Sequence, residues 1–184
     1  ESGGDESPAG ILARALDLLA AVFRIDWAGV YRLDAPGRGL TLVHALSGAV
    51  PPGFPVLPGE AARRWLESVE TPEFVCPACR PPDHPAWGFV RAIVPDSGLT
   101  EPAEDLEAAV IPLRSLGDHA RGVIVQLARR RPTVLFRDSI VAERHLPFLQ
   151  LIAQHADRAF ENVRLTESLR DRSAQLATSL RTLE

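Results

Sequence analysis

Hydrophobic residues near the start of the chain recur at helical spacing. Those that share one helical face are Ile11, Leu12, Ala15, Leu16, Leu19, Val22 and Phe23. Ser7 and Pro8 form a favourable start, because a serine hydroxyl can cap the first turn and proline fits the first helical position. The pattern predicts an amphipathic helix that ends near Ile25.

Short apolar runs then predict strands. Residues 27–33 and 40–46 are rich in aromatic and β-branched types and flank a turn sequence with proline and glycine, which predicts a β-hairpin. A short helix follows, marked by Ala62, Trp65, Leu66 and Val69. Residues 73–76, 108–114 and 122–128 predict three more strands.

Two segments are rich in proline. Residues 50–59 carry four prolines, which predicts a loop. The segment from Pro77 to about Leu106 carries six more prolines, Pro77 included, and a long loop is expected there; loops of this length in a compact domain are usually functional or disordered. Within it, residues 89–94 fit either a strand or a helical turn.

The last helix is expected from about Pro147 to the end of the chain. Its final part carries an apolar seam, interrupted by Ser173, of Leu169, Leu176, Leu180 and Leu183. That spacing approximates a coiled coil of about two heptads. A leucine seam without a partner in its own domain predicts a parallel homodimer.

Residues 108–117, 122–130 and 153–165, which read AAVIPLRSLG, GVIVQLARR and AQHADRAFENVRL, together resemble the second half of a GAF domain. The resemblance covers about residues 9–165. It implies an α+β fold: an antiparallel sheet with the N- and C-terminal helices packed on one face and a ligand pocket on the other. Residues 1–8 are expected to be disordered, and residues 166–184 to extend as a coiled-coil-like helix toward an output domain.

The same resemblance implies a non-catalytic sensory or regulatory domain, which binds an unknown small molecule or dimerises through its terminal helices. A sensor histidine kinase of a two-component system is the favoured output, ahead of a diguanylate cyclase or a phosphatase. WAGVYRL at residues 27–33 also resembles the first strand of free methionine sulfoxide reductases, which are GAF enzymes. A thiol enzyme, or a redox or metal switch, that uses Cys76 and Cys79 is therefore the alternative.

Four residues are candidates for binding a ligand. Tyr31, Trp87 and Phe89 are aromatic residues of segments that the resemblance places near the pocket. His44 alternates with Leu40, Leu42 and Leu46, so it is expected on their face of the sheet. Haem ligation by His44 is conceivable but not expected, because a hydrogen-bonded histidine at a strand edge explains it better.

Cys76 and Cys79 enclose two residues, and His84 follows five residues later. Two thiols at this spacing can hold a metal such as zinc or form a small disulfide. A closed zinc site needs four ligands, so Asp83, His119, His44, water or a second chain would have to complete it. Two reduced thiols in a loop are the simpler interpretation.

Composition narrows the choice of partners. The net charge of −4 gives no basic surface for nucleic acid. No apolar run is long enough to span a bilayer and no signal peptide opens the chain, so a cytoplasmic location without membrane contact is expected. All twenty basic residues are arginine, and a chain without lysine lacks one residue of the cyclic-nucleotide GAF set. Since the chain lacks a start methionine and is still helical at its end, we expect it to be part of a longer protein.

Overall fold

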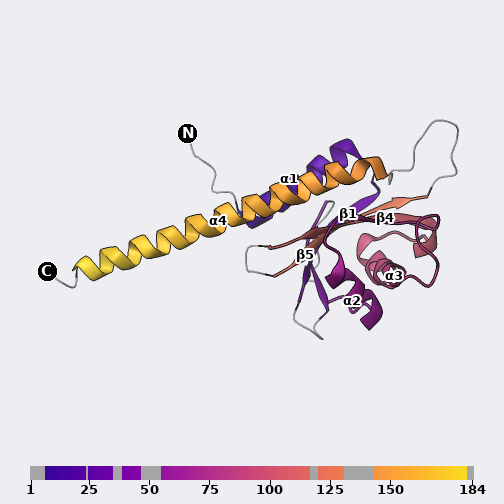
Figure 1. Ribbon diagram of the computed structural model, residues 1–184, viewed down its shortest axis with the longest axis horizontal. Coiled ribbons are helices and arrows are strands. Elements are labelled where there is room, and N and C mark those ends of the chain that lie inside the picture. The colour runs from indigo at the N-terminus through magenta and orange to yellow at the C-terminus, as the bar shows by residue number, and fades with distance from the viewer. Residues whose placement is uncertain are drawn as a thin grey trace.

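A computed structural model of the chain describes residues 7–23, 25–34, 39–46, 55–116, 120–130 and 143–181. It confirms the predicted α+β class, with a five-stranded antiparallel sheet between two layers of helices (Figure 1). The elements in chain order are α1 Pro8–Val22, β1 Trp27–Leu33, β2 Leu40–Ala45, α2 Glu60–Ser68, β3 Glu73–Val75, α3 Pro85–Ser97, the 3-10 turn η1 Ala103–Asp105, β4 Leu106–Leu113, β5 Gly122–Arg129, the 3-10 turn η2 Glu143–His145, and α4 Leu146–Arg181.

The strands lie in the order β2-β1-β5-β4-β3, and each neighbouring pair is antiparallel. β5 lies at the centre and pairs with β1 on one side and β4 on the other, which explains its almost continuous burial. The strand β3 forms one edge of the sheet. The segment that leaves β3 therefore starts at a sheet edge.

The two faces of the sheet carry separate hydrophobic cores. Successive side chains of a strand point to opposite faces, and β1 follows this rule. Ala28 and Val30 pack under α1 and α4, whereas Trp27 and Tyr31 pack against the layer of α2 and α3. The terminal helices thus cover one face and the two internal helices the other, as Figure 1 shows.

The helix α1 begins as predicted. The hydroxyl oxygen of Ser7 accepts a hydrogen bond from the amide of Gly10 at 3.2 Å, and Pro8 occupies the first turn. Its buried face consists of the predicted residues Ile11, Leu12, Ala15, Leu16 and Leu19. Val22, which was predicted on the same face, is instead 56% exposed at the end of the helix.

The prediction of a long loop from Pro77 to Leu106 is wrong for the middle of this segment, where the structure has the helix α3. Residues 89–94 belong to this helix. Pro85 stands in its first turn, where the missing amide costs no hydrogen bond. Pro95 lies in its last turn, just before Gly98 ends the helix in a left-handed conformation with φ of 68°. The prolines mark the two ends of a helix.

The helix α4 continues without a break beyond the sheet (Figure 1). Phe160 is the last fully buried residue among those of α4 whose side chains the structure describes. From Leu165 to Leu176 every residue is exposed. Of the predicted seam, Leu169 and Leu176 are each 66% exposed, while Leu183 and the side chain of Leu180 lie outside the described residues. None of the described helices is both long and apolar enough to cross a membrane.

Candidate functional site

Tyr31, Trp87 and Phe89 lie together in the core between the sheet and α3. Each is at most 2% exposed, and the rings of Tyr31 and Phe89 meet edge to face with 6.4 Å between centroids. In this structure these predicted ligand residues therefore fill the face that the GAF resemblance assigns to a pocket. Ligand binding by them stays a prediction that requires α3 to move.

Two polar groups are enclosed in this aromatic layer. The hydroxyl of Tyr31 donates a 2.8 Å hydrogen bond to Oδ2 of Asp96 at the end of α3. Burial, and after it the Asp96 carboxylate, raises the pKa of Tyr31 far above its usual range. The indole nitrogen of Trp87 is buried without a hydrogen-bond partner in the described part of the chain. A buried donor without an acceptor is unfavourable by about 1–3 kcal/mol.

His44 does not share the face of Leu40 and Leu42, so that prediction is wrong. A β-bulge between β1 and β2 pairs Tyr31 with Leu42 but Val30 with His44. One extra residue, Val43, reverses the alternation. Because Val30 packs under the terminal helices, its partner His44 lies on that face and away from Tyr31. His44 therefore lies on the opposite face of the sheet from the aromatic candidates Tyr31, Trp87 and Phe89.

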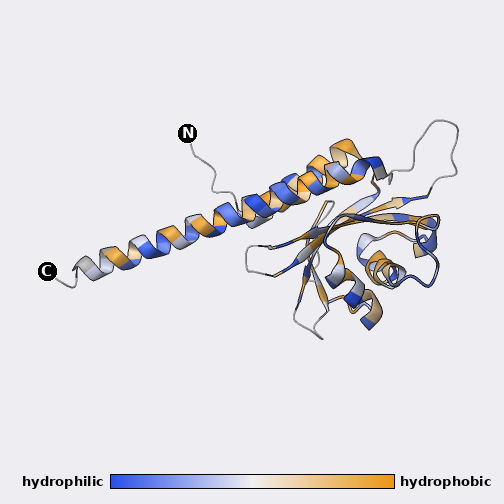
Figure 2. Ribbon diagram, viewed as in Figure 1, coloured by the Kyte–Doolittle hydropathy of each residue, from blue (hydrophilic) through white to orange (hydrophobic). Residues whose placement is uncertain are grey.

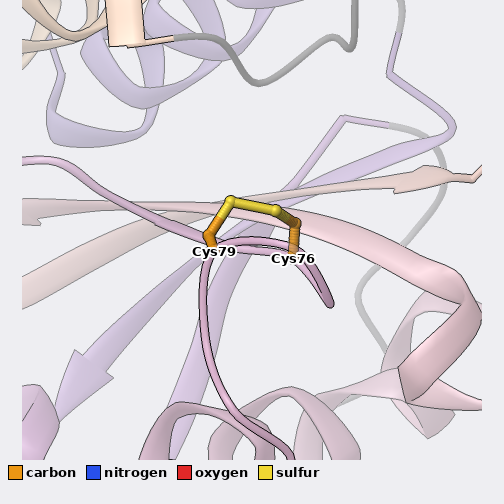
Figure 3. Close-up of a disulfide and its surroundings, with 2 residues drawn as sticks. All are labelled: Cys76 and Cys79. Carbon is orange, nitrogen blue, oxygen red and sulfur yellow. A yellow bond between two sulfur atoms is a disulfide. The ribbon is translucent and has the colours of Figure 1, made fainter.

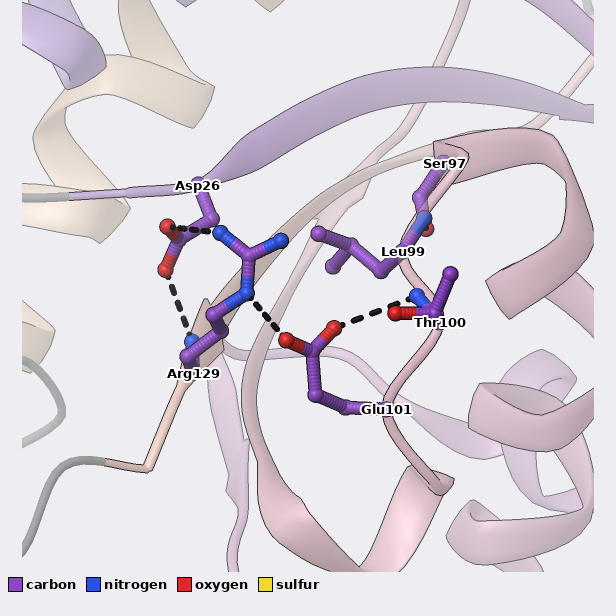
Figure 4. A network of polar contacts seen from close by, with 6 residues as sticks. All are labelled: Asp26, Ser97, Leu99, Thr100, Glu101 and Arg129. Carbon is purple, nitrogen blue, oxygen red and sulfur yellow. Dashed lines mark hydrogen bonds and ion pairs between the residues drawn. The ribbon is translucent and has the colours of Figure 1, made fainter.

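Arg129 joins three segments that are distant in sequence (Figure 4). Its amide and its guanidinium both donate to the carboxylate of Asp26, at 2.8 and 3.0 Å, and its Nε donates to Glu101. The hydrogen bond from Arg129 is the main cause that lowers the pKa of Glu101. This network ties the segment after α3 to the start of β1. Neither ion pair could be expected from the sequence, because separations of 28 and 103 residues carry no local signal.

Cys76 and Cys79 form a disulfide (Figure 3). The bond closes the turn that leaves β3, and Cα atoms of the two residues are 5.0 Å apart. The bonded sulfurs are not thiolate ligands, and no three His, Cys, Asp or Glu side chains of the described residues come together as a metal site. In this structure Cys76, Cys79 and His84 are therefore not arranged to bind zinc. Zinc binding by the reduced pair stays a prediction.

His84 has a structural role instead. Its Nδ1 accepts a 3.2 Å hydrogen bond from the amide of Ala86 and so caps the start of α3. Its ring packs edge to face on Trp65 at 6.0 Å. Asp83 beside it is exposed, and the other suggested ligand, His119, lies outside the described residues.

A groove of about 360 Å³ runs between α1 and α4 on the outer side of the terminal helices. It is largely apolar and includes Leu18, Leu151, His155 and Ala159. Leu18 and Leu151 are more than half exposed although they are large and apolar. His155 is exposed and lines this groove. In Figure 2 apolar residues recur along α4, also where the helix leaves the sheet.

A second groove, of about 450 Å³ and more polar, lies where β4 meets α4. There Oδ1 of Asp157 accepts a 2.9 Å hydrogen bond from the amide of Arg114. Burial raises the pKa of Asp157, and the amides of Arg114 and Ser115 offset part of the increase. Arg121, which also lines the groove, donates to the carbonyl of Glu67 in the last turn of α2 and to that of Val69, which follows the helix. The hydrogen bonds of Asp157 and Arg121 thus link neighbouring elements of the fold, which explains these polar side chains by a structural role.

The order of the elements, the antiparallel sheet and the separation of terminal from internal helices define the GAF fold. No protein-family model matches the chain, and no curated protein matches it in sequence. Solved structures do match. A GAF domain/HD domain protein from Geobacter sulfurreducens has a TM-score of 0.56 at 14% identity, over 88% of this chain and 97% of that one.

The GAF domain of a two-component sensor histidine kinase from Bacillus halodurans gives a TM-score of 0.52 at 22% identity, over 85% of this chain and 95% of that one. A free methionine-R-sulfoxide reductase from Neisseria meningitidis gives 0.55 at 19% identity, over 90% and 84%. The predicted GAF fold is confirmed. At these identities the likeness concerns the fold, which hosts both sensors and an enzyme.

Proposed function

We propose that this chain is a non-catalytic sensory or regulatory domain that dimerises through its terminal helices and passes a conformational change along α4 to an output module. The observation that carries the proposal is the continuity of α4, which packs on the sheet at one end and stands free of it at the other. At 1.5 Å per residue its 36 residues span about 54 Å. A shift at the sheet would therefore be felt well outside the domain.

The exposed leucines support a second copy of the chain as the partner of α4. Leu169 and Leu176 are seven residues apart, which is the heptad spacing of a coiled coil. The apolar groove between α1 and α4 lies on the same helix, nearer to the sheet. Burying one such leucine is favourable by about 1.5–3 kcal/mol. A parallel arrangement would place the C-terminal ends of both α4 helices at the same end of the dimer.

Sedimentation at micromolar concentration tests the dimer. We expect a concentration-dependent dimer that Leu176→Glu shifts toward the monomer. Gln175→Glu is the matched control, because it adds the same charge at the next residue, off the seam, and should leave the mass unchanged. A strict monomer, unaffected by either change, would contradict the proposal.

Trp87 supports a small-molecule ligand on the α3 side. Its buried indole donor has no partner among the described residues, so a ligand with an acceptor atom would remove an unfavourable state. A ligand that prefers one packing of α3 shifts the population toward it. Native mass spectrometry and absorption spectra of freshly purified protein should reveal a bound molecule. If the purified protein holds no molecule and binds none from a metabolite panel, the remaining interpretation is a purely structural dimerisation domain.

For the output module we propose a sensor histidine kinase, by analogy with the Bacillus halodurans protein that shares the fold. A diguanylate cyclase or a phosphatase would serve the same role. Fusing residues 1–184 to a histidine kinase core tests the transmission. Inserting one or two residues after Arg181 rotates the output by about 100° or 200°. We expect kinase activity to vary with the insert and to recover when seven residues, two full turns, are inserted.

The Cys76–Cys79 disulfide favours one second candidate, a thiol enzyme that reduces free methionine sulfoxide. In that reaction a dithiol gives two electrons and two protons, and methionine, water and a disulfide result. Turnover with dithiothreitol as reductant separates the candidates. Robust activity that Cys76→Ser abolishes would establish the enzyme and overturn the sensory proposal.

A further inference from the structure

We propose that Cys76 and Cys79 are a reversible redox site that exchanges electrons with an external dithiol, and that its state controls the stability of the start of α3. Three observations meet at this point. The two cysteines are bonded to each other, one is buried and one exposed, and the turn that they close leads directly to α3.

The backbone holds the two cysteines together without the disulfide. The carbonyl oxygen of Cys76 accepts hydrogen bonds from the amides of Cys79 and Arg80, both at 2.9 Å. The guanidinium of Arg80 also donates to Glu73 of β3 at 2.7 Å, across the same turn. Because these contacts do not involve sulfur, the reduced thiols stay at a separation from which the bond can form again. The pair is therefore suited to repeated opening and closing.

The disulfide closes a ring with only two intervening residues. Its effect on the entropy of the unfolded chain is accordingly small, since that effect grows with loop length. A bond of this kind contributes little as a global staple. Its main consequence is local, for the turn and for the helix that follows.

The difference in burial between the two cysteines determines which sulfur is attacked first. Cys76 is only 7% exposed, whereas Cys79 and the two residues before it are exposed. Access decides which sulfur is attacked. A thiolate of the external dithiol therefore attacks Cys79 Sγ, and the S–S bond breaks with its electron pair on Cys76 Sγ, which takes up a proton. The second thiolate of the dithiol then attacks the external sulfur, and Cys79 leaves and is protonated.

In sum, the protein gains two electrons and two protons, and the external dithiol becomes a disulfide. A disulfide reagent of the same class reverses both steps. No metal and no further cofactor enters this balance.

The effect on α3 follows from the chain path. Residues 80–83 connect the redox pair to His84, whose side chain caps α3 at the amide of Ala86. Trp87 follows in the first turn and is buried against the sheet. Once the covalent bond is absent, only hydrogen bonds and the Arg80–Glu73 pair, in a partly exposed segment, hold the turn. Local opening of the turn and of the first turn of α3 then becomes more frequent.

Residue-resolved hydrogen exchange of the full chain in dithiothreitol redox buffers tests this. Four amides report on opening of the turn and of the helix start, because each donates a hydrogen bond there: those of Cys79, Arg80, Ala86 and Trp87. We expect their exchange to accelerate by about threefold or more on reduction, while the amides of β5 stay unchanged. Reoxidation should restore the slow rates.

The Cys79→Ser variant is the matched control and should show the fast rates in both buffers. Alkylation of the reduced protein gives an independent result, with Cys79 expected to react faster than Cys76. A disulfide that resists dithiothreitol in the folded protein, unchanged exchange at Ala86 and Trp87, or faster alkylation of Cys76 would each overturn the proposal.

The role of this redox state as a signal rests on the proposed sensory function, but the chemistry of the pair does not. Hydrogen exchange and alkylation probe only the turn and α3, whereas sedimentation probes the terminal helices. A failure of either proposal is therefore visible separately.

Discussion

The hydroxyl of Tyr31 in β1 donates its 2.8 Å hydrogen bond to Asp96, a residue 65 positions later in the last turn of α3. This bond fastens the far end of α3 to the sheet, as the disulfide turn and the His84 cap hold its start. The helix that covers the aromatic layer is thus anchored at both ends. Either anchor is a place where a signal could loosen it.

Removing the Tyr31 hydroxyl should change the alkaline stability of the protein. The folded-state pKa of Tyr31 is raised, so its contribution to stability is fully present below the unfolded pKa of about 10 and is lost as the pH rises beyond it. Tyr31→Phe loses about 1–2 kcal/mol at neutral pH. It should also flatten the decline of stability above pH ~10. Urea denaturation from pH 7 to 11 measures both; parallel curves for the two proteins would contradict the assignment.

Asp157 is expected to follow the same sign rule at lower pH. Its raised folded-state pKa makes its contribution fully present below the unfolded value of about 3.9 and lost as the pH rises through the folded pKa. Asp157→Asn keeps an oxygen that can accept from Arg114 and carries no charge. Relative to wild type it should therefore gain stability between pH 3 and 7. Asp157→Ala lacks the acceptor and should lose about 1 kcal/mol throughout. Thermal unfolding across this range distinguishes the three proteins.

Gly98 ends α3 with a φ of 68°, and no atom lies within 4 Å of the position of an added Cβ. Replacement by alanine therefore costs only backbone strain, about 1–2 kcal/mol. Asparagine tolerates this conformation better and should cost less. Gly59→Ala is the control, since Gly59 also has open space around it but a φ of −55°. Urea midpoints should be higher for Gly98→Asn and Gly59→Ala than for Gly98→Ala; an equal effect of both alanines would refute the strain argument.

Substitutions at two neighbouring residues of α4 should distinguish effects on folding from effects on association. Ile152 is 6% exposed in the core under the sheet, whereas Leu151 is 61% exposed on the outer groove. Ile152→Ala should destabilise the monomer by about 2–5 kcal/mol. Leu151→Ala should leave the monomer stability within about 1 kcal/mol and weaken the dimer. Chemical unfolding at low concentration and sedimentation at high concentration measure the two effects.

The sequence alone determined the local structure of most elements. The spacing of Leu12, Leu16 and Leu19 and the cap at Ser7 sufficed to predict α1, because helix periodicity and capping act over a few residues. The positions of the strands followed from similar short-range signals. The resemblance to GAF domains then supplied the correct architecture, and a disulfide between Cys76 and Cys79 was one of the possibilities that their spacing left open.

The tertiary structure decided what depends on distant partners. The β-bulge at Val43 moved His44 to the other face, since the pairing with β1 and not the alternation of β2 sets the register. Arg129 met Asp26 and Glu101 only because β5 lies beside β1 and ends near the segment after α3. Such contacts arise from the order of strands in the sheet, and no periodicity along the chain encodes them.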